Sequence, residues 1–132
     1  MDAIRGISHL SLSVRDLDAS LDFYRRVLDL PVLSEPFVGS AFQGREALLL
    51  AGRVAVCLQE HAANDGAGFD PARTGLDHLA FHLPSLEALE TWIRRLDDLG
   101  VDHSEPKRVM FGTMIDFRDP DGIQVELFVR DD

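Results

Sequence analysis

The stretch DHLAFHLPSLEALETWIRRLDDLGV (Asp77–Val101) repeats an earlier stretch, SHLSLSVRDLDASLDFYRRVLDLPV (Ser8–Val32), in register and without a gap. When one is laid over the other, histidine falls on histidine, an arginine pair falls on an arginine pair, and leucines recur at matching places. A long internal repeat of this kind indicates that one structural unit occurs twice. The sequence therefore predicts two copies of one module.

Each copy begins with a strand and continues into a helix. Residues alternate in character over Ile7–Val14 and again over His78–Leu83, as in a strand with one packed face. Asp16 and Ser85 follow, and both residue types accept hydrogen bonds from the free amides at a helix start. Apolar residues then recur at helical spacing in both copies.

The helices are expected to end near Pro31, which cannot continue a helix, and at Gly100, which suits a left-handed C-terminal cap. Short apolar runs then predict further strands in each copy. In the first copy they are Val32–Ser34, Ala41–Phe42, Ala47–Ala51 and Val54–Gln59, and in the second Val101–Ser104, Thr113–Arg118 and Ile123–Val129.

Each module is thus predicted to run strand, helix, then three strands, giving an α+β fold of two tandem βαβββ modules. One such unit cannot bury both faces of its sheet, so we expect the two to pair in a single domain spanning residues 1–132. Module one covers about 5–60 and module two about 76–130. The small, polar, Gly- and Pro-containing segment of about 61–75 reads as a linker.

Composition excludes some partners. The formal net charge is -10, which disfavours binding to a nucleic acid backbone or to an anionic membrane surface. No apolar run approaches the roughly 18 residues that span a bilayer, and the start MDAIRGISHL does not resemble a secretion signal. The single cysteine, Cys57, cannot form an internal disulfide, so we expect a reducing, cytoplasmic setting.

Three polar residues stand out on these apolar strands. His78 and His82 share one strand face with Ala80, while large apolar residues take the other face. His9 is the counterpart of His78 in the first copy, and Glu126 lies between Val125 and Leu127 in the last strand. A carboxylate among apolar neighbours is costly to bury unless it is paired or coordinated.

Two interpretations account for His9, His78 and Glu126. They can be ordinary polar side chains on solvated strand faces. Alternatively, two imidazoles and one carboxylate form a set that holds Fe(II) and leaves coordination positions open, and Zn, Mn, Co or Ni would also fit. We favour the metal because the repeat places one histidine at the same point of both modules.

The chain resembles the vicinal oxygen chelate superfamily, which includes glyoxalase I, extradiol dioxygenases and fosfomycin-resistance enzymes. The resemblance rests on HLSLSVRDLDASLDFYRRVL, GLDHLAFHL and DPDGIQVELF and covers essentially the whole chain. It implies an open barrel of paired modules around a divalent metal held by His9, His78 and Glu126. It also implies a homodimer with shared sites.

The sequence departs from the glyoxalase I pattern at the fourth ligand, which is often a Glu. The repeat aligns Cys57 with Glu126, so the usual proton-shuttling carboxylate is missing there. Gln59 and His61 share the face of Cys57, and any of the three is a possible direct or water-mediated ligand. A buried Cys is more often a core residue.

The leading hypothesis is a small metalloenzyme that binds a small-molecule substrate through two adjacent oxygens and performs glyoxalase-type lyase or isomerase chemistry. His82, four residues and about 13 Å from His78 along its strand, is the expected catalytic residue beside Glu126, and Glu60 or another acid is an alternative proton carrier. An extradiol-type dioxygenase is the alternative reaction. A metal-free, bleomycin-resistance-like binding protein is the alternative without chemistry.

Overall fold

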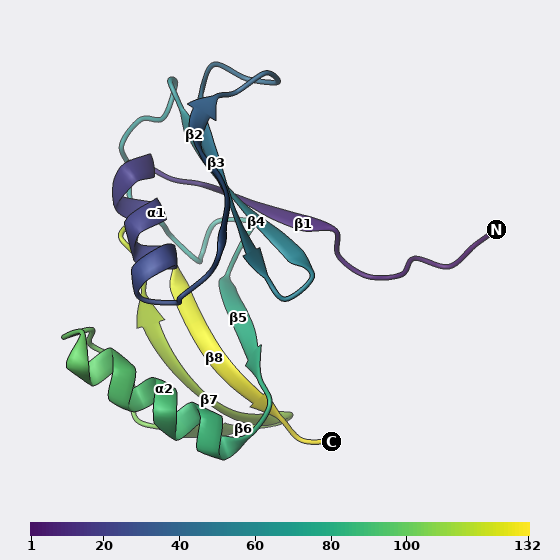
Figure 1. Cartoon of the computed structure of the whole chain (residues 1–132), viewed down its shortest axis with the longest axis vertical. Coiled ribbons are helices and arrows are strands. Elements are labelled where there is room, and N and C mark those ends of the chain that lie inside the picture. Colours follow the sequence, from purple (N-terminus) through teal and green to yellow (C-terminus); the bar gives the residue numbers. More distant parts are fainter. The chain divides into compact units, whose positions relative to one another are not determined.

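The computed structural model describes all residues, 1–132, and divides them into two compact units, Met1–Ala67 and Gly68–Asp132. Each unit contains one helix and four strands in the order strand, helix, strand, strand, strand (Figure 1). The predicted α+β fold of two βαβββ modules is therefore confirmed.

In the first unit, the sheet has the strand order β1-β4-β3-β2. β1 pairs with β4 in parallel, and the other two pairings are antiparallel. The helix α1 packs against one face of this sheet (Figure 1). The elements are β1 (His9–Ser13), α1 (Leu17–Arg26), β2 (Val32–Val38), β3 (Gly44–Ala51) and β4 (Val54–His61).

The second unit repeats this topology with the strand order β5-β8-β7-β6, in which β5 and β8 are parallel. The helix α2 packs against one face of the sheet through β5 and β8 (Figure 1). The elements are β5 (His78–Leu83), α2 (Leu86–Asp98), β6 (Lys107–Val109), β7 (Gly112–Arg118) and β8 (Gln124–Arg130).

Both helices begin as the sequence predicts. The Asp16 carboxylate accepts from the Ala19 amide, and the Ser85 hydroxyl accepts from the Ala88 amide. Each cap satisfies a backbone donor that has no partner within the helix. Gly100 takes a φ of +69° after α2, the left-handed conformation in which glycine meets no Cβ penalty.

Several elements differ from the sequence prediction: β2 and β3, for example, are longer than expected. Helix α1 ends at Arg26, well before Pro31, because the chain turns at Asp29 with a φ of 53°. Ala41–Phe42 lies in the connection between β2 and β3, and Val101–Ser104 is not a strand. The edge strand β6 forms further along, at Lys107–Val109.

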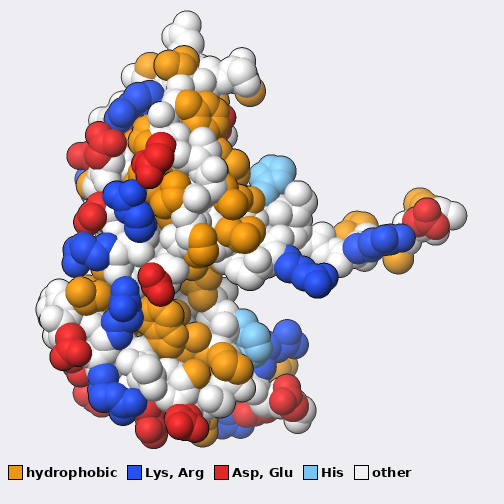
Figure 2. Space-filling model, viewed as in Figure 1, with side chains coloured by type: hydrophobic (Ala, Val, Ile, Leu, Met, Phe, Trp, Pro, Cys, Tyr) orange, Lys and Arg blue, Asp and Glu red, His pale blue; other side chains and the backbone are white.

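The N-terminal segment of the first unit, Met1–Ser8, has no helix or strand and leads into β1 as an extended, exposed chain (Figure 1). Its side chains include the strongly exposed Ile4 and Ile7, and Figure 2 shows hydrophobic and basic side chains along it. Neither helix of the structure has the length and apolar composition needed to cross a membrane.

A histidine fastens the loop after α2 in the second unit. The His103 ring lies with Nδ1 2.8 Å from the Ser104 carbonyl and Nε2 2.8 Å from the Asp97 carboxylate. Both partners are acceptors, so only the protonated ring can donate to both. The Ser104 carbonyl and then Asp97 raise the pKa of His103 above its usual value.

We predict that this contact makes stability depend on pH. Because the pKa of His103 is higher in the folded chain, its contribution is fully present below the unfolded-state pKa of about 6.5 and is lost as pH rises through the folded value. Chemical denaturation of wild type and His103→Gln at several pH values measures the difference. Their unfolding free energies should converge as the solution becomes alkaline, and a constant gap would contradict the assignment.

Candidate functional site

The pairing of β5 with β8 gathers polar side chains on the sheet face of the second unit that is turned away from α2. His78 lies beside Gln124, and Ala80 lies beside Glu126. Across the next pairing, Asp116 of β7 lies directly opposite Glu126. We call this the polar face; its alternation follows from the period of two along each strand.

Glu126 is a buried carboxylate, 7% exposed, on this face. Its Oε1 accepts from the Gln124 amide at 2.9 Å and lies 3.6 Å from His78 Nε2. Two donor atoms about 2.0–2.2 Å from one metal ion lie about 3–3.5 Å apart at common coordination angles, so the observed spacing is near that of two ligands. The donors are an imidazole nitrogen and a carboxylate oxygen, the pair that transition metals accept.

The orientation of the His78 ring is set by its neighbour. Nδ1 of His78 lies 2.7 Å from the Asp77 carboxylate, which leaves Nε2 directed at Glu126. The Asp77 hydrogen bond is the main cause that raises the pKa of His78, with the charge of Glu126 adding to it. A carboxylate on the far nitrogen of a histidine is the usual support for a metal-binding imidazole.

His9 repeats this arrangement in the first unit. Its Nδ1 lies 3.1 Å from the hydroxyl of Ser8, the residue immediately before it. Ser8 and Asp77 occupy equivalent positions of the repeat, so each histidine has its Nδ1 engaged by the preceding side chain. Sequence analysis missed these supports, although the repeat itself aligns them.

The possible fourth ligands lie on the face of the first sheet that carries His9. Cys57 pairs with Ser11 and Gln59 with Ser13, two and four residues beyond His9. Cys57 is buried at 8% exposure, and the Gln59 amide donates to the Glu46 carboxylate at 3.2 Å. The His61 ring packs on Phe42, with centroids 4.4 Å apart.

Glu46 is a functional candidate that sequence analysis did not name. It lies on β3 directly opposite Gln59, on the same face as Cys57, and it is half-buried. It therefore provides an acid on this face, although the repeat position that corresponds to Glu126 is Cys57. The sequence around Gln59 gives no indication of Glu46, because Glu46 comes from a different strand and reaches this face only when β3 pairs with β4.

Glu60 proves to be unsuited to the proton-carrying role suggested for it. It lies on the opposite face of β4, where its carboxylate accepts from the Leu17 amide at 2.7 Å and from the Arg45 guanidinium. Its acceptor capacity is directed to the start of α1 and to a neighbouring cation. Neighbouring residues of a strand point to opposite faces, so Glu60 lies on the face opposite Gln59, where it meets α1.

His82 lies on the polar face, beside Phe128 of β8, and is exposed. Two strand positions separate it from Ala80, which is the partner of Glu126. Ala80, the residue between the two histidines on this face, has a small side chain. His82 shares this face with His78 but lies about 13 Å from it along the strand.

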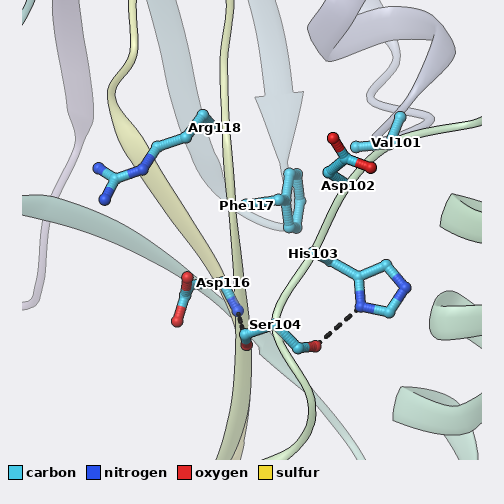
Figure 3. A pocket seen from close by; sticks show the side chains of 7 residues that line it. All are labelled: Val101, Asp102, His103, Ser104, Asp116, Phe117 and Arg118. Carbon is cyan, nitrogen blue, oxygen red and sulfur yellow. Dashed lines mark hydrogen bonds between the residues drawn. The ribbon is translucent and has the colours of Figure 1, made fainter.

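A cavity of about 490 Å³ opens at the edge of the second sheet. Figure 3 shows Asp116 and Arg118 on one side of β7 and Phe117 on the other, with the loop Val101–Ser104 beside the strand. The Asp116 amide donates to the Ser104 hydroxyl at 3.0 Å, and the Ser104 amide donates to the Asp116 carbonyl at 2.8 Å. β6 does not extend as far as Asp116, so these two bonds take the place of strand pairing there and hold the Asp116 backbone in position.

Neither unit by itself holds three His, Cys, Asp or Glu side chains placed to bind one metal ion. The second unit supplies the pair His78 and Glu126, and His9 belongs to the first unit. The donor pair nevertheless fits a divalent metal, because His78 Nε2 lies 3.6 Å from Glu126 Oε1 while Asp77 engages the far nitrogen of the ring.

Comparison with known families agrees with this topology. The family model described as the Glyoxalase/Bleomycin resistance protein/Dioxygenase superfamily matches residues 6–127. The chain belongs to this superfamily. A solved glyoxylase/bleomycin resistance protein/dioxygenase domain from Frankia sp. EAN1pec is 34% identical, covers 98% of this chain and 100% of its own, and has a TM-score of 0.86.

Two relatives have names that mention an activity. Metallothiol transferase FosB of Bacillus licheniformis is 31% identical over 94% of this chain and 75% of its own length. The fosfomycin resistance protein FosX of Mesorhizobium loti is 26% identical, covers 96% of this chain and 92% of its own, and has a TM-score of 0.67. These comparisons establish the superfamily, but the names of the relatives refer to different activities and so do not identify one reaction.

Proposed function

We propose that this protein is a divalent-metal-dependent enzyme that binds a small-molecule substrate through two adjacent oxygens. The observation that carries the proposal is the 3.6 Å approach of His78 Nε2 to the buried Glu126 carboxylate, with Asp77 holding the far nitrogen of the ring. Glyoxalase-type lyase or isomerase chemistry is the reaction we favour.

His9 is the proposed third ligand. Its position in the repeat, its free Nε2 and the metal-binding pattern of the resembled family support it. Because neither unit has three suitable groups alone, the site would combine side chains from a first and a second unit. Fe, Mn, Zn, Ni and Co all accept two imidazoles and a carboxylate. Gln59 or Cys57 would complete the shell directly or through water.

The bound metal would act as a Lewis acid that polarises the two substrate oxygens. The chain's own residues would orient the substrate and move a proton. His82 is placed on the polar face for that step, and Glu46 offers a carboxylate on the corresponding face of the first unit. Asp77 keeps the His78 ring in the orientation that presents Nε2.

Replacing Glu126 by Ala should reduce metal content sharply and leave the secondary structure intact, because the removed carboxylate is the buried donor beside His78. Metal analysis of protein purified without chelators, together with circular dichroism, measures both effects. Loss of the supporting Asp77 carboxylate in Asp77→Ala should weaken metal affinity by a smaller factor, about 10- to 100-fold.

Asp70→Ala is the matched control, since Asp70 is an exposed acid of the same unit that pairs with Arg73. It should retain the wild-type metal content. Equal metal content in the Glu126 variant and wild type would contradict the assignment of this ligand.

His82→Ala should lower turnover by about 10²- to 10⁴-fold, the usual contribution of a general acid or base, and should keep both metal and fold. A screen of 2-oxoaldehyde thiol adducts and related substrates supplies the assay. Glu46→Gln, made in parallel, tests the carboxylate of the first unit. Normal turnover in His82→Ala would show that His82 is only a solvent-exposed residue at the end of the strand. Loss of metal from this variant would show that His82 is a ligand.

Three alternatives remain, of which one has a specific observation in its favour. The 31% identity to metallothiol transferase FosB favours thiol transfer as the second candidate. An extradiol-type dioxygenase would use the same three ligands with Fe(II) or Mn(II), and oxygen consumption distinguishes it. A bleomycin-resistance-like binding protein would purify without metal.

We further propose a homodimer whose subunits share each site, because each module presents one sheet face that needs a partner. Exposed apolar side chains such as Val38, Met110 and Phe111 support an additional contact. Analytical ultracentrifugation at micromolar concentration should give the dimer mass. A monomer under these conditions would contradict shared sites between subunits.

A further inference from the structure

The polar face carries two carboxylates side by side. Asp116 of β7 and Glu126 of β8 are directly opposite each other in the antiparallel pairing, so their side chains leave the same face. Like charges placed opposite each other in a sheet destabilise it unless each is compensated. Neighbouring side chains must therefore supply positive charge or hydrogen bonds here.

Each carboxylate has its own partner. Glu126 accepts from Gln124 and lies near His78, whereas Asp116 Oδ2 lies 2.6 Å from the ammonium of Lys107 on β6. Lys107 is the only lysine in the chain. Its pairing partner on β7 is Met114, two residues before Asp116, which places the Lys107 side chain on the polar face.

Asp116 cannot easily move away from Lys107. Both the amide and the carbonyl of Asp116 are hydrogen-bonded to Ser104. The Asp116 side chain is 19% exposed, whereas that of Lys107 is 54% exposed. Two further cations share this face: Arg130 lies four residues beyond Glu126 on β8, and Arg118 lies two residues beyond Asp116 and donates to the Gly122 carbonyl at 3.3 Å. Asp116 therefore lies between Lys107 and Arg118 on this face.

We propose that Asp116 is a specificity-determining residue that neutralises Lys107 and makes the polar face reject dianionic ligands such as phosphonates. The accepted substrate would then be one whose groups beyond the two chelating oxygens are uncharged. The proposal rests on the proposed function, because a substrate would meet Asp116 only if it binds at His78 and Glu126 on the same face. It also separates this chain from relatives named for resistance to fosfomycin, a phosphonate.

The test is direct binding of methylphosphonate, with inorganic phosphate as a second probe, measured by calorimetry on the full chain at low ionic strength. Wild type should bind weakly. Asp116→Asn keeps the shape and the backbone contacts but removes the charge that repels the ligand, so it should bind at least about tenfold more tightly. Asp116→Asn with Lys107→Met should lose that gain, because the released ammonium is then absent.

Asp131→Asn is the matched control. Asp131 is an exposed acid of the same unit paired with Arg108, and the neighbouring strand position puts Arg108 on the other face from Lys107. This variant changes the net charge equally and should bind like wild type. Equal gains in both Asn variants, or a gain that survives the loss of Lys107, would overturn the proposal, as would tight binding by wild type.

Each titration is made with and without added Mn²⁺ or Zn²⁺. Lys107 and Asp116 are both present in the metal-free protein, so the difference between wild type and Asp116→Asn should appear in either state. A protein that binds no metal would contradict the proposed function and still leave this comparison valid. A metal-binding protein with no difference between the variants would contradict only the role of Asp116.

Discussion

The parallel register of β5 with β8 is the constraint on which the candidate site depends. It sets Ala80 beside Glu126 and His78 beside Gln124, and the diagonal approach of His78 to Glu126 follows from it. A slip of one residue would turn every side chain of a strand to the opposite face. The apolar face against α2 opposes any such slip, because it would bury the charged residues and expose Val125 and Leu127.

The same register explains the electrostatics of the second unit. An apolar sheet that carries Glu126 and Asp116 in adjacent strands must compensate both charges, and it does so with separate partners. Gln124 compensates one carboxylate through a hydrogen bond that adds no charge. Lys107 compensates the other. The two adjacent carboxylates of the sheet are thus compensated in different ways.

The two units preserve some features of their common plan and not others. In both, a histidine begins the first strand and has its Nδ1 engaged by the residue before it, Ser8 or Asp77. At the position of Glu126, the first unit has Cys57, and its acid on that face is Glu46 on the next strand. The buried carboxylates of the chain, Asp119, Asp121 and Glu126, all lie in the second unit.

The sequence alone determined the repeat, the fold class and the strand His78–Leu83, as well as the helix starts at Asp16 and Ser85. These features depend on alternation, helical periodicity and capping, which involve residues close together in the chain. Only the tertiary structure decided that β6 forms at Lys107–Val109, that Glu60 serves the start of α1, and that Asp116 meets Lys107. Those outcomes depend on which residues of distant strands become partners, and that choice is made when whole faces are buried together.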